Sequence, residues 1–219
     1  MQTDMTVGKP MKMILDFTIP VFIGNVFQQF YNMVDAIIVG KFVGTKGLAA
    51  VGSTGTIMFL IIGFLMGLTA GFTVLTSQKF GAGKMDEMRQ SVGNAGLLSI
   101  IISVIMTIGS MVGMRSLLTL MNTPEDIFQD AYTYIMIICG GIFAQVLYNI
   151  LASILRALGN SKTPLYFLIL AALLNIVLDL LFIIVFHMGV AGAAWATITA
   201  QGVSGVLCLV YIIKCVPEL

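Results

Sequence analysis

The sequence predicts an all-α membrane protein whose transmembrane helices form one bundle, and two observations carry this prediction. The 219 residues are 58% hydrophobic and only 10% charged, with a mean hydropathy of +1.03, whereas a soluble domain carries about 25% charged residues. The charges also cluster, because 47–78, 90–114 and 188–213 contain no Asp, Glu, Lys or Arg. Each stretch can cross a hydrocarbon core of ~30 Å as a helix, which takes ~20 residues.

The order of apolar runs and turn residues predicts six transmembrane helices in one lobe. The first contains Pro20, which removes a backbone hydrogen bond and should kink the helix. The fourth has a start signal, since Thr123 can cap a helix whose first residue is Pro124. Ser161 or Thr163 marks the fifth start similarly. The expected division is a cytoplasmic segment 1–12, a lobe 13–214 with helices 13–39, 47–78, 88–113, 124–157, 162–186 and 191–214, and a cytoplasmic end 215–219.

Lys and Arg are distributed unevenly between the two sides of this arrangement. By the positive-inside rule, the side with more of them faces the cytoplasm. We therefore expect both ends of the chain in the cytoplasm and a multi-pass protein of a bacterial-type plasma membrane. The net charge of +1, without a basic tract, gives no reason to expect a nucleic-acid partner. One side holds Lys9, Lys12, Lys79, Lys84, Arg89, Arg156, Lys162 and Lys214, and the other holds Lys41, Lys46 and Arg115.

Two carboxylates, Asp35 and Asp179, lie deep within expected spans. An ionisable group there costs at least ~2.5–3.5 kcal/mol on insertion scales, so it usually faces a partner or a water-filled cavity. Membrane proteins keep such groups mostly to handle ions or protons. We therefore take both residues as candidates for a functional site.

Other polar side chains follow the two aspartates at helical spacing. Gln28 and Tyr31 share a helix face with Asp35, and Asn175 precedes Asp179 by one turn. Oxygen ligands of this kind suit Na⁺. The same carboxylates could hold a proton, because burial disfavours their charged form. Alternatively, the amides and hydroxyls only join neighbouring helices, at ~0.6 kcal/mol each. Further polar residues on the fourth and sixth helices are Asn149, Thr197, Thr199 and Gln201.

Motifs along nearly the whole chain resemble those of multidrug and toxin extrusion (MATE) transporters. Each motif is weak alone, but their order makes the set specific. The chain resembles the N-terminal six-helix lobe of the bacterial and archaeal type, which has Asp in the first helix and Asn-x3-Asp in the fifth. The motifs are Ile19-Pro20, Gln28-Gln29, Tyr31-Asn32 and Val34-Asp35 with Gly40 and Gly44, then residues 77–83, 156–164, Asn175 with Asp179, and 189–197.

The resemblance implies secondary active efflux of amphipathic or cationic compounds, with antiport of Na⁺ or H⁺ and no other cofactor. The family has twelve helices in two lobes, so the chain is expected to be a fragment that needs a C-terminal lobe, or a half-transporter that needs a second copy. Its partners would be the lipid bilayer and small-molecule drugs or toxins. Carried over by position, the coupling-ion residues would be Asp35, Asn149, Asn175, Asp179 and Thr197, with Gln28 and Tyr31 nearby and bending near Pro20.

Three other functions compete with this interpretation. A lipid-linked oligosaccharide flippase of the same superfamily would carry basic residues in its cavity, and here the Lys and Arg residues are assigned to loops and helix ends. An intramembrane aspartyl protease could use two buried aspartates to activate water. Val34 and Leu178 precede the aspartates here, unlike the Tyr-Asp and Gly-x-Gly-Asp motifs of those enzymes, so no enzymatic activity is expected. A non-transporting membrane subunit is the third alternative.

Overall fold

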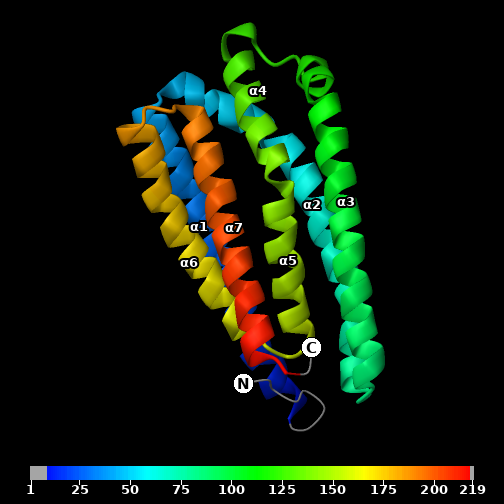
Figure 1. Cartoon of the computed structure of the whole chain (residues 1–219). Helices are drawn as coiled ribbons and strands as arrows, with labels where there is room; N and C mark the ends of the chain where they lie inside the picture. The colour runs from blue at the N-terminus through cyan, green and yellow to red at the C-terminus, as the bar shows by residue number, and fades with distance from the viewer. Residues whose placement is uncertain (1–8, 218–219) are drawn as a thin grey trace.

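A computed structural model describes residues 9–217, and these fold as a bundle of long helices (Figure 1). Five helices are each long and apolar enough to cross a membrane, and a bent pair passes the same test as a sixth. The six expected spans are therefore all present. The helices are α1 (Pro10–Phe42), α2 (Thr45–Gly81), α3 (Met85–Leu120), α4 (Glu125–Gly140), α5 (Ile142–Ala157), α6 (Lys162–Asp179), the π-helix η1 (Leu180–Val185) and α7 (Val190–Cys215).

The ends of the helices differ from the sequence-based boundaries by a few residues. The helix α4 begins one residue later than expected, with Pro124 as the N-cap residue. Ser161 is the N-cap of α6, and Asn160 supports it because its Oδ1 accepts the N–H of Thr163 at 3.1 Å. The first helix is described as continuous through Pro20, which is buried. The expected segments 1–12 and 215–219 lie partly outside the described residues.

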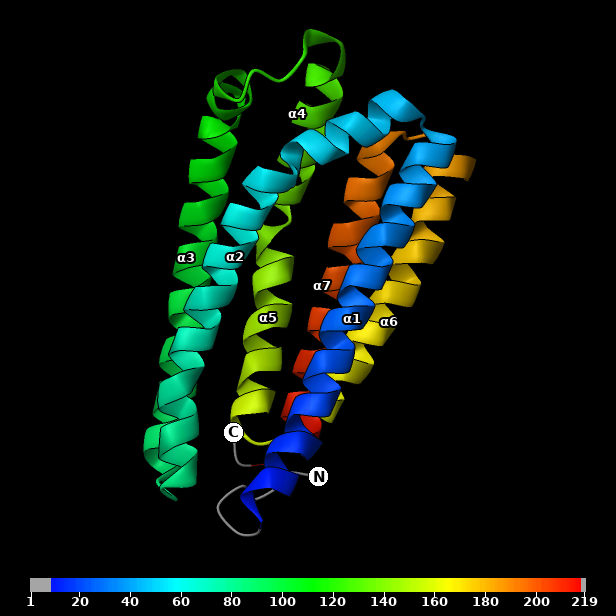
Figure 2. The ribbon, with the colours of Figure 1, turned by 180° about the vertical axis from the view of Figure 1, so that it is seen from behind.

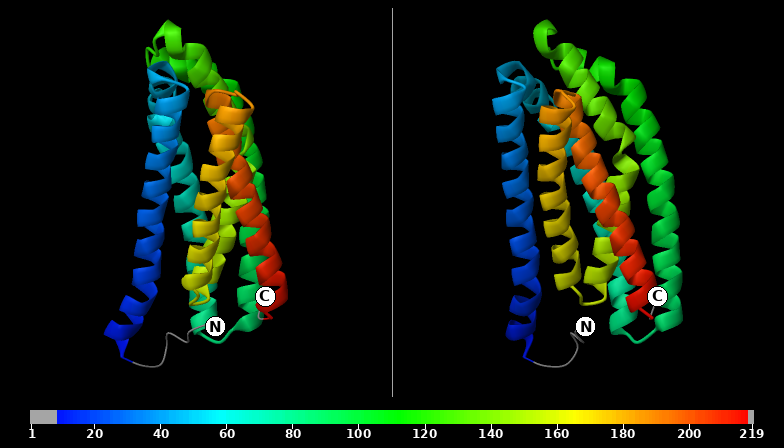
Figure 3. Two further views of the ribbon diagram at one scale, coloured as in Figure 1. Left: turned by 90° about the vertical axis from the view of Figure 1, so that its left-hand side faces the viewer. Right: turned by 60° about the vertical axis from the view of Figure 1, so that its left-hand side comes forward.

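The expectation of one helix over 124–157 was wrong, because the chain bends by 47° between α4 and α5. The bend lies at Gly141, and the change of direction can be followed in Figure 3. A Cβ atom on Gly141 would lie only 2.3 Å from Cγ2 of Ile198 on α7. The glycine thus allows close contact with α7 at the bend, whereas the sequence offered no proline to mark a break.

The fifth span also changes its helical form, directly after Asp179. The α-helix α6 ends at this residue and continues as the π-helix η1. A π-helix has a wider turn, with hydrogen bonds from i to i+5, and such turns often lie at functional sites. The sequence predicted the span but not this change, since the run after Asp179 is uniformly apolar.

The bundle has two sides, which are seen from opposite directions in Figures 1 and 2. The helices α1, α6 and α7 run side by side on one, and α2 and α3 lie with the α4–α5 pair on the other. The helix α7 also contacts α4 and α5, so it joins the two sides. The start of α1 and the end of α7 lie at the same end of the bundle, as an even number of crossings requires.

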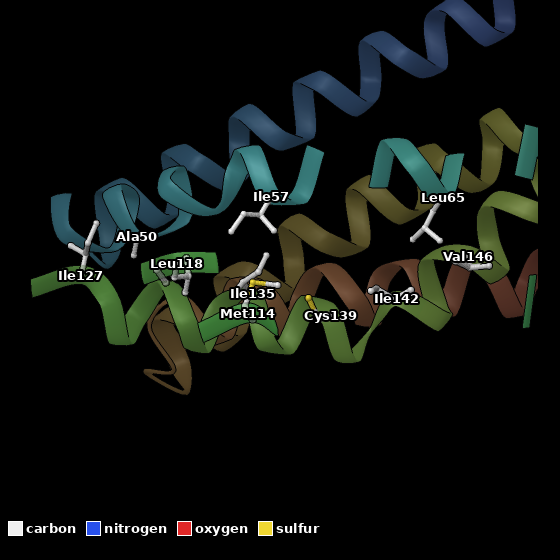
Figure 4. Packing of buried hydrophobic residues seen from close by; sticks show 11 residues of the cluster. Ala50, Ile57, Leu65, Met114, Leu118, Ile127, Ile135, Cys139, Ile142 and Val146 are labelled. Atoms are coloured by element: carbon white, nitrogen blue, oxygen red, sulfur yellow. The ribbon is translucent and has the colours of Figure 1, made fainter. Parts of the chain in front are cut away.

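The second of these sides is held by apolar packing. Side chains from α2, α3, α4 and α5 form a continuous cluster that extends across the bend at Gly141 (Figure 4). Ile135 on α4 is fully buried within it. We call this the apolar cluster, and its members are Ala50, Ile57, Leu65, Met114, Leu118, Ile127, Ala131, Ile135, Cys139, Ile142 and Val146.

Candidate functional site

The two aspartates meet between α1 and α6. These helices pack against each other, and the carboxylates of Asp35 and Asp179 interact directly. Asp179 is fully buried, while Asp35 is half-buried. The sequence placed each aspartate within a span, and the structure shows that the two spans bring them together.

The oxygen atoms around the aspartates lack hydrogen-bond donors. Within residues 9–217, no hydrogen bond reaches either carboxylate oxygen of Asp179 or Oδ1 of Asp35, and these atoms are buried. Oδ1 of Asn175 and Oε1 of Gln201 are buried and unpaired in the same way. An ionised carboxylate only accepts hydrogen bonds, so two facing carboxylates cannot satisfy each other without a proton or a cation. We call Asp35, Asn175, Asp179 and Gln201 the acceptor cluster.

The side chain of Asn175 is oriented by α7. Its Nδ2 donates a long hydrogen bond of 3.5 Å to Oγ1 of Thr197, which itself donates to the carbonyl of Ala193 at 3.0 Å. The amide nitrogen is thereby turned toward α7 and the amide oxygen is left for another partner. The structure thus places Thr197 next to Asn175, while its role in ion binding stays a prediction.

Tyr31 links α1 to α7 beside the aspartates. Its hydroxyl is within hydrogen-bonding reach of the Gln28 and Gln201 side chains and interacts electrostatically with Asp35. The tyrosine is 7% exposed and Gln201 is 5% exposed. A rearrangement of the carboxylates would therefore also change the contact of this tyrosine with α7. Gln28 and Tyr31 were expected near the site, and the structure brings both to it.

Asn149 and Pro20 lie apart from the carboxylates, in a small polar cavity. This cavity of about 50 Å³ lies between α1, α5, α6 and α7, and Gln28 and Gln201 also line it. Asn149 is buried, and its Nδ2 donates to the carbonyl of Gln145 at 2.8 Å. In the described part of the chain, no hydrogen bond joins Asn149 to either aspartate. Its predicted role therefore depends on Gln28 and Gln201, which border both places.

The structure adds Tyr134, which the sequence did not indicate, to the surroundings of the aspartates, and it leaves Thr199 outside them. Tyr134 on α4 is 3% exposed and interacts electrostatically with both aspartates and with Tyr31. Its only signal was a tyrosine inside an apolar run, which also suits ordinary packing. Thr199, which the sequence offered with Thr197 and Gln201 as a polar residue of the last span, is exposed. Residues two apart on a helix point in different directions, so Thr199 cannot share the face of Thr197.

The donor atoms of the site are oxygens from carboxylates, amides and hydroxyls. The described residues contain no group of three or more His, Cys, Asp or Glu side chains that could hold a metal ion. The acceptor cluster thus has two acidic groups and neutral oxygens around them. Such a set fits a hard monovalent cation or a shared proton, because each could supply the positive charge that the buried oxygens lack.

Known proteins share both the sequence and the helix arrangement of this chain. The MatE family model matches residues 20–181. The relative "Probable multidrug resistance protein YpnP" of Bacillus subtilis is 36% identical over 211 residues, which cover 96% of this chain and 47% of the relative. The chain spans about half the length of the curated relatives it matches.

Solved structures agree with this family assignment. A multidrug resistance MATE family transporter of the MOP superfamily, in an outward-facing conformation, superposes with a TM-score of 0.88 at 31% identity. A MOP superfamily transporter from Pyrococcus furiosus gives the same TM-score and identity. In both cases the match covers 95% of this chain and 46% of the other. With this agreement over most of its length, the chain belongs to the MATE family of multi-pass membrane transporters.

Proposed function

We propose that this lobe binds the coupling ion, Na⁺ or H⁺, of a secondary active efflux transporter for amphipathic or cationic compounds. The supporting observation is the acceptor cluster, in which a fully buried Asp179 faces Asp35 without a hydrogen-bond donor among the described residues. Leaving such groups unpaired in a membrane is costly. A bound cation or a shared proton would remove this cost.

The proposed mechanism depends on the contacts around the two aspartates. Binding of a cation or proton neutralises the pair, and the Tyr31 contacts with Gln28 and Gln201 then change, because Tyr31 interacts with Asp35. These contacts join α1 to α7, so the helices repack and the adjoining cavity changes its affinity for substrate. An ion can drive this change only through different affinities for the two arrangements. Pro20 lines the cavity and lacks a backbone N–H, which makes it a suitable place for α1 to bend.

The rest of the transport path would come from outside this chain. Since the chain spans about half of its relatives, we propose that a C-terminal lobe or a second copy completes the substrate cavity. The end of the bundle that carries the start of α1 and the end of α7 would face the cytoplasm of a bacterial-type plasma membrane, as the Lys and Arg distribution favours. The partners would be the bilayer and small-molecule drugs or toxins.

The test is a binding measurement on the purified chain in lipid nanodiscs. Sodium binding and proton release would be followed for the wild type, Asp35→Asn and Asp179→Asn. Asp130→Asn is the matched control, because Asp130 is an exposed aspartate on α4 away from the acceptor cluster. We expect both site variants to lose ion binding and the control to keep it.

The possible results distinguish a Na⁺ site, a proton site and the absence of the proposed site. Sodium binding that disappears in both site variants establishes a Na⁺ site between α1 and α6. A proton released near neutral pH, without an effect of sodium, establishes a proton site. Wild-type sodium and proton binding in Asp179→Asn would overturn the proposed site. In the complete transporter, coupled export at the wild-type rate by Asp35→Asn would overturn the mechanism.

A further inference from the structure

Arg156 occupies a position that the ion site does not explain. It lies in the last turn of α5 and is half-buried. Its side chain lines both the polar cavity beside Asn149 and an open cleft between α1, α2 and α5. The sequence assigned it to the cytoplasmic end of its span, and the structure shows that Arg156 borders both the cavity and the cleft.

The charge of Arg156 has no acidic partner in the described chain. Its Nε donates to the carbonyl of Ala152 at 3.1 Å, and this is its one hydrogen bond within residues 9–217. The ion pairs of residues 9–217 involve other residues. Its electrostatic neighbours are Tyr148 and Cys208, and the Tyr148 hydroxyl is itself a donor, to the carbonyl of Pro164 at 3.0 Å. A guanidinium carries five N–H donors in a planar fork that matches carboxylate and phosphate.

Two further donors lie beside this guanidinium. Ser153 is three residues before Arg156 on α5 and lines the open cleft, and Ser161 lines the polar cavity as the N-cap residue of α6. Ser161 is 6% exposed. Neither hydroxyl takes part in a hydrogen bond with the described residues, so both can donate to a ligand. The N-terminus of α6 adds a positive partial charge at Ser161.

The open cleft next to these donors is amphipathic. It has a volume of about 390 Å³ and is bordered by Phe17 and Val21 of α1 and Val74 of α2. The hydroxyls of Thr73 and Ser77 on its α2 wall donate back to backbone carbonyls, which leaves that wall effectively apolar. A ligand with an anionic end and an apolar body would match both regions.

We propose that Arg156, with Ser153 and Ser161, binds the phosphate or carboxylate group of an amphipathic anion whose apolar part lies against Phe17, Val21 and Val74. The anion has two possible sources, an acidic lipid headgroup or a soluble amphipathic anion. Neither Asp35 nor Asp179 lines this cavity or cleft, but Gln201 of the acceptor cluster borders the cavity, so the anion site adjoins the coupling-ion site without including its carboxylates.

The test measures binding of n-octyl phosphate to the whole chain in phosphatidylcholine nanodiscs. Arg156→Gln should weaken binding by about 10-fold or more, since it removes a charge-assisted contact. Arg156→Lys keeps the charge but loses the planar fork of N–H donors, so its affinity for n-octyl phosphate should lie between those of the wild type and Arg156→Gln. Arg115→Gln is the matched control, because Arg115 lies at the opposite end of the bundle, and it should bind like the wild type. Ser161→Ala keeps the charge and should weaken binding by a smaller factor.

A second arm distinguishes the sources. Nanodiscs that contain phosphatidylglycerol would compete with n-octyl phosphate if the natural ligand is a lipid headgroup, and would leave its affinity unchanged if the ligand is soluble. Equal binding of n-octyl phosphate by the wild type and Arg156→Gln would overturn the proposal. If Arg156→Gln fails to fold, wild-type affinity in both Arg156→Lys and Ser161→Ala would overturn it as well.

Discussion

The two sides of the bundle bury very different kinds of side chains. The apolar cluster between α2, α3, α4 and α5 consists of side chains that need only close packing. The acceptor cluster between α1, α6 and α7 buries carboxylate and amide oxygens without donors in the described chain. Packing stabilises both sides, since Ile38, Val39 and Ile183 are buried beside the acceptor cluster, but only the acceptor cluster would gain further free energy from the ion that we propose it binds. The two sides are joined most extensively by the contacts of α7 with α4 and α5, and also by contacts of α1 with α2 and of α5 with α6.

The largest expected effect is on the apolar cluster. Ile135→Ala removes a fully buried side chain, and such changes typically cost about 2–5 kcal/mol. Ion binding by the folded fraction should stay at the wild-type level. Thermal unfolding in nanodiscs measures the first effect and a sodium or proton titration the second. Ile105→Ala is the control, because Ile105 is 61% exposed on α3. Equal unfolding midpoints of the two variants would break the comparison.

The acceptor cluster should respond in the opposite way. Asp179→Asn removes a buried carboxylate that has no donor in residues 9–217, so the ion-free protein should unfold at no lower temperature than the wild type. What should disappear is stabilisation by the ion, which amounts to about 2.7 kcal/mol at 100 times the Kd. The measurement is the unfolding midpoint with and without saturating ion. An ion-dependent shift of wild-type size in the variant would contradict the assignment.

The bend offers a test of how α7 contacts the other side. Gly141→Ala places a Cβ against Ile198, and overpacking of this kind costs about 1–3 kcal/mol. Gly140→Ala is a control on the neighbouring residue, since a Cβ there meets nothing within 4 Å. The double variant, which combines Gly141→Ala with Ile198→Ala, shortens the opposing side chain and should recover part of the lost stability. Thermal unfolding of the four proteins decides, and equal midpoints for the two single glycine variants would refute the role given to Gly141.

The smallest expected effect concerns the residue that sequence reasoning missed. Tyr134→Phe keeps the ring of a buried side chain but removes the hydroxyl that interacts with both aspartates. We expect ion affinity to fall by about 2- to 10-fold, the range of one hydrogen bond, with little change in stability. Ion titration measures this, and Tyr132→Phe, on a half-buried tyrosine of the same helix, is the control. Unchanged affinity in Tyr134→Phe would remove this tyrosine from the site.

The sequence predicted the spans well because length and lack of charge are sufficient to place a membrane helix. It also pointed to Asp35 and Asp179, since an acidic group is conspicuous in an apolar run. It could not place Tyr134 or orient Arg156, because their surroundings are decided by which helices meet. Asn149 does not contact the aspartates because α5 packs on α7, α2 and α3 and not on α1 within the described residues, and spacing along the chain does not indicate which helices meet.

The bend at Gly141 and the π-helix after Asp179 could not be predicted either, because the local sequence does not indicate them. Gly140 and Gly141 are compatible with an unbroken helix in a membrane, where glycine is frequent, and only the contact with Ile198 explains the break. The run after Asp179 contains no residue that distinguishes an α-turn from a π-turn. Local composition therefore set the length of each span, whereas contacts between helices set its shape.

The π-helix after Asp179 has a consequence for the comparison of related chains. Its wider turn fits more residues into the same rise than an α-helix does, so Leu180–Val185 holds surplus chain length between Asp179 and the start of α7 at Val190. A relative that lacks one residue in this stretch could wind it as an α-helix and keep its aspartate in place. In a sequence alignment, a one-residue gap in this stretch would therefore reflect a change from π-helix to α-helix. The residues before and after the gap would still occupy equivalent positions in the two structures.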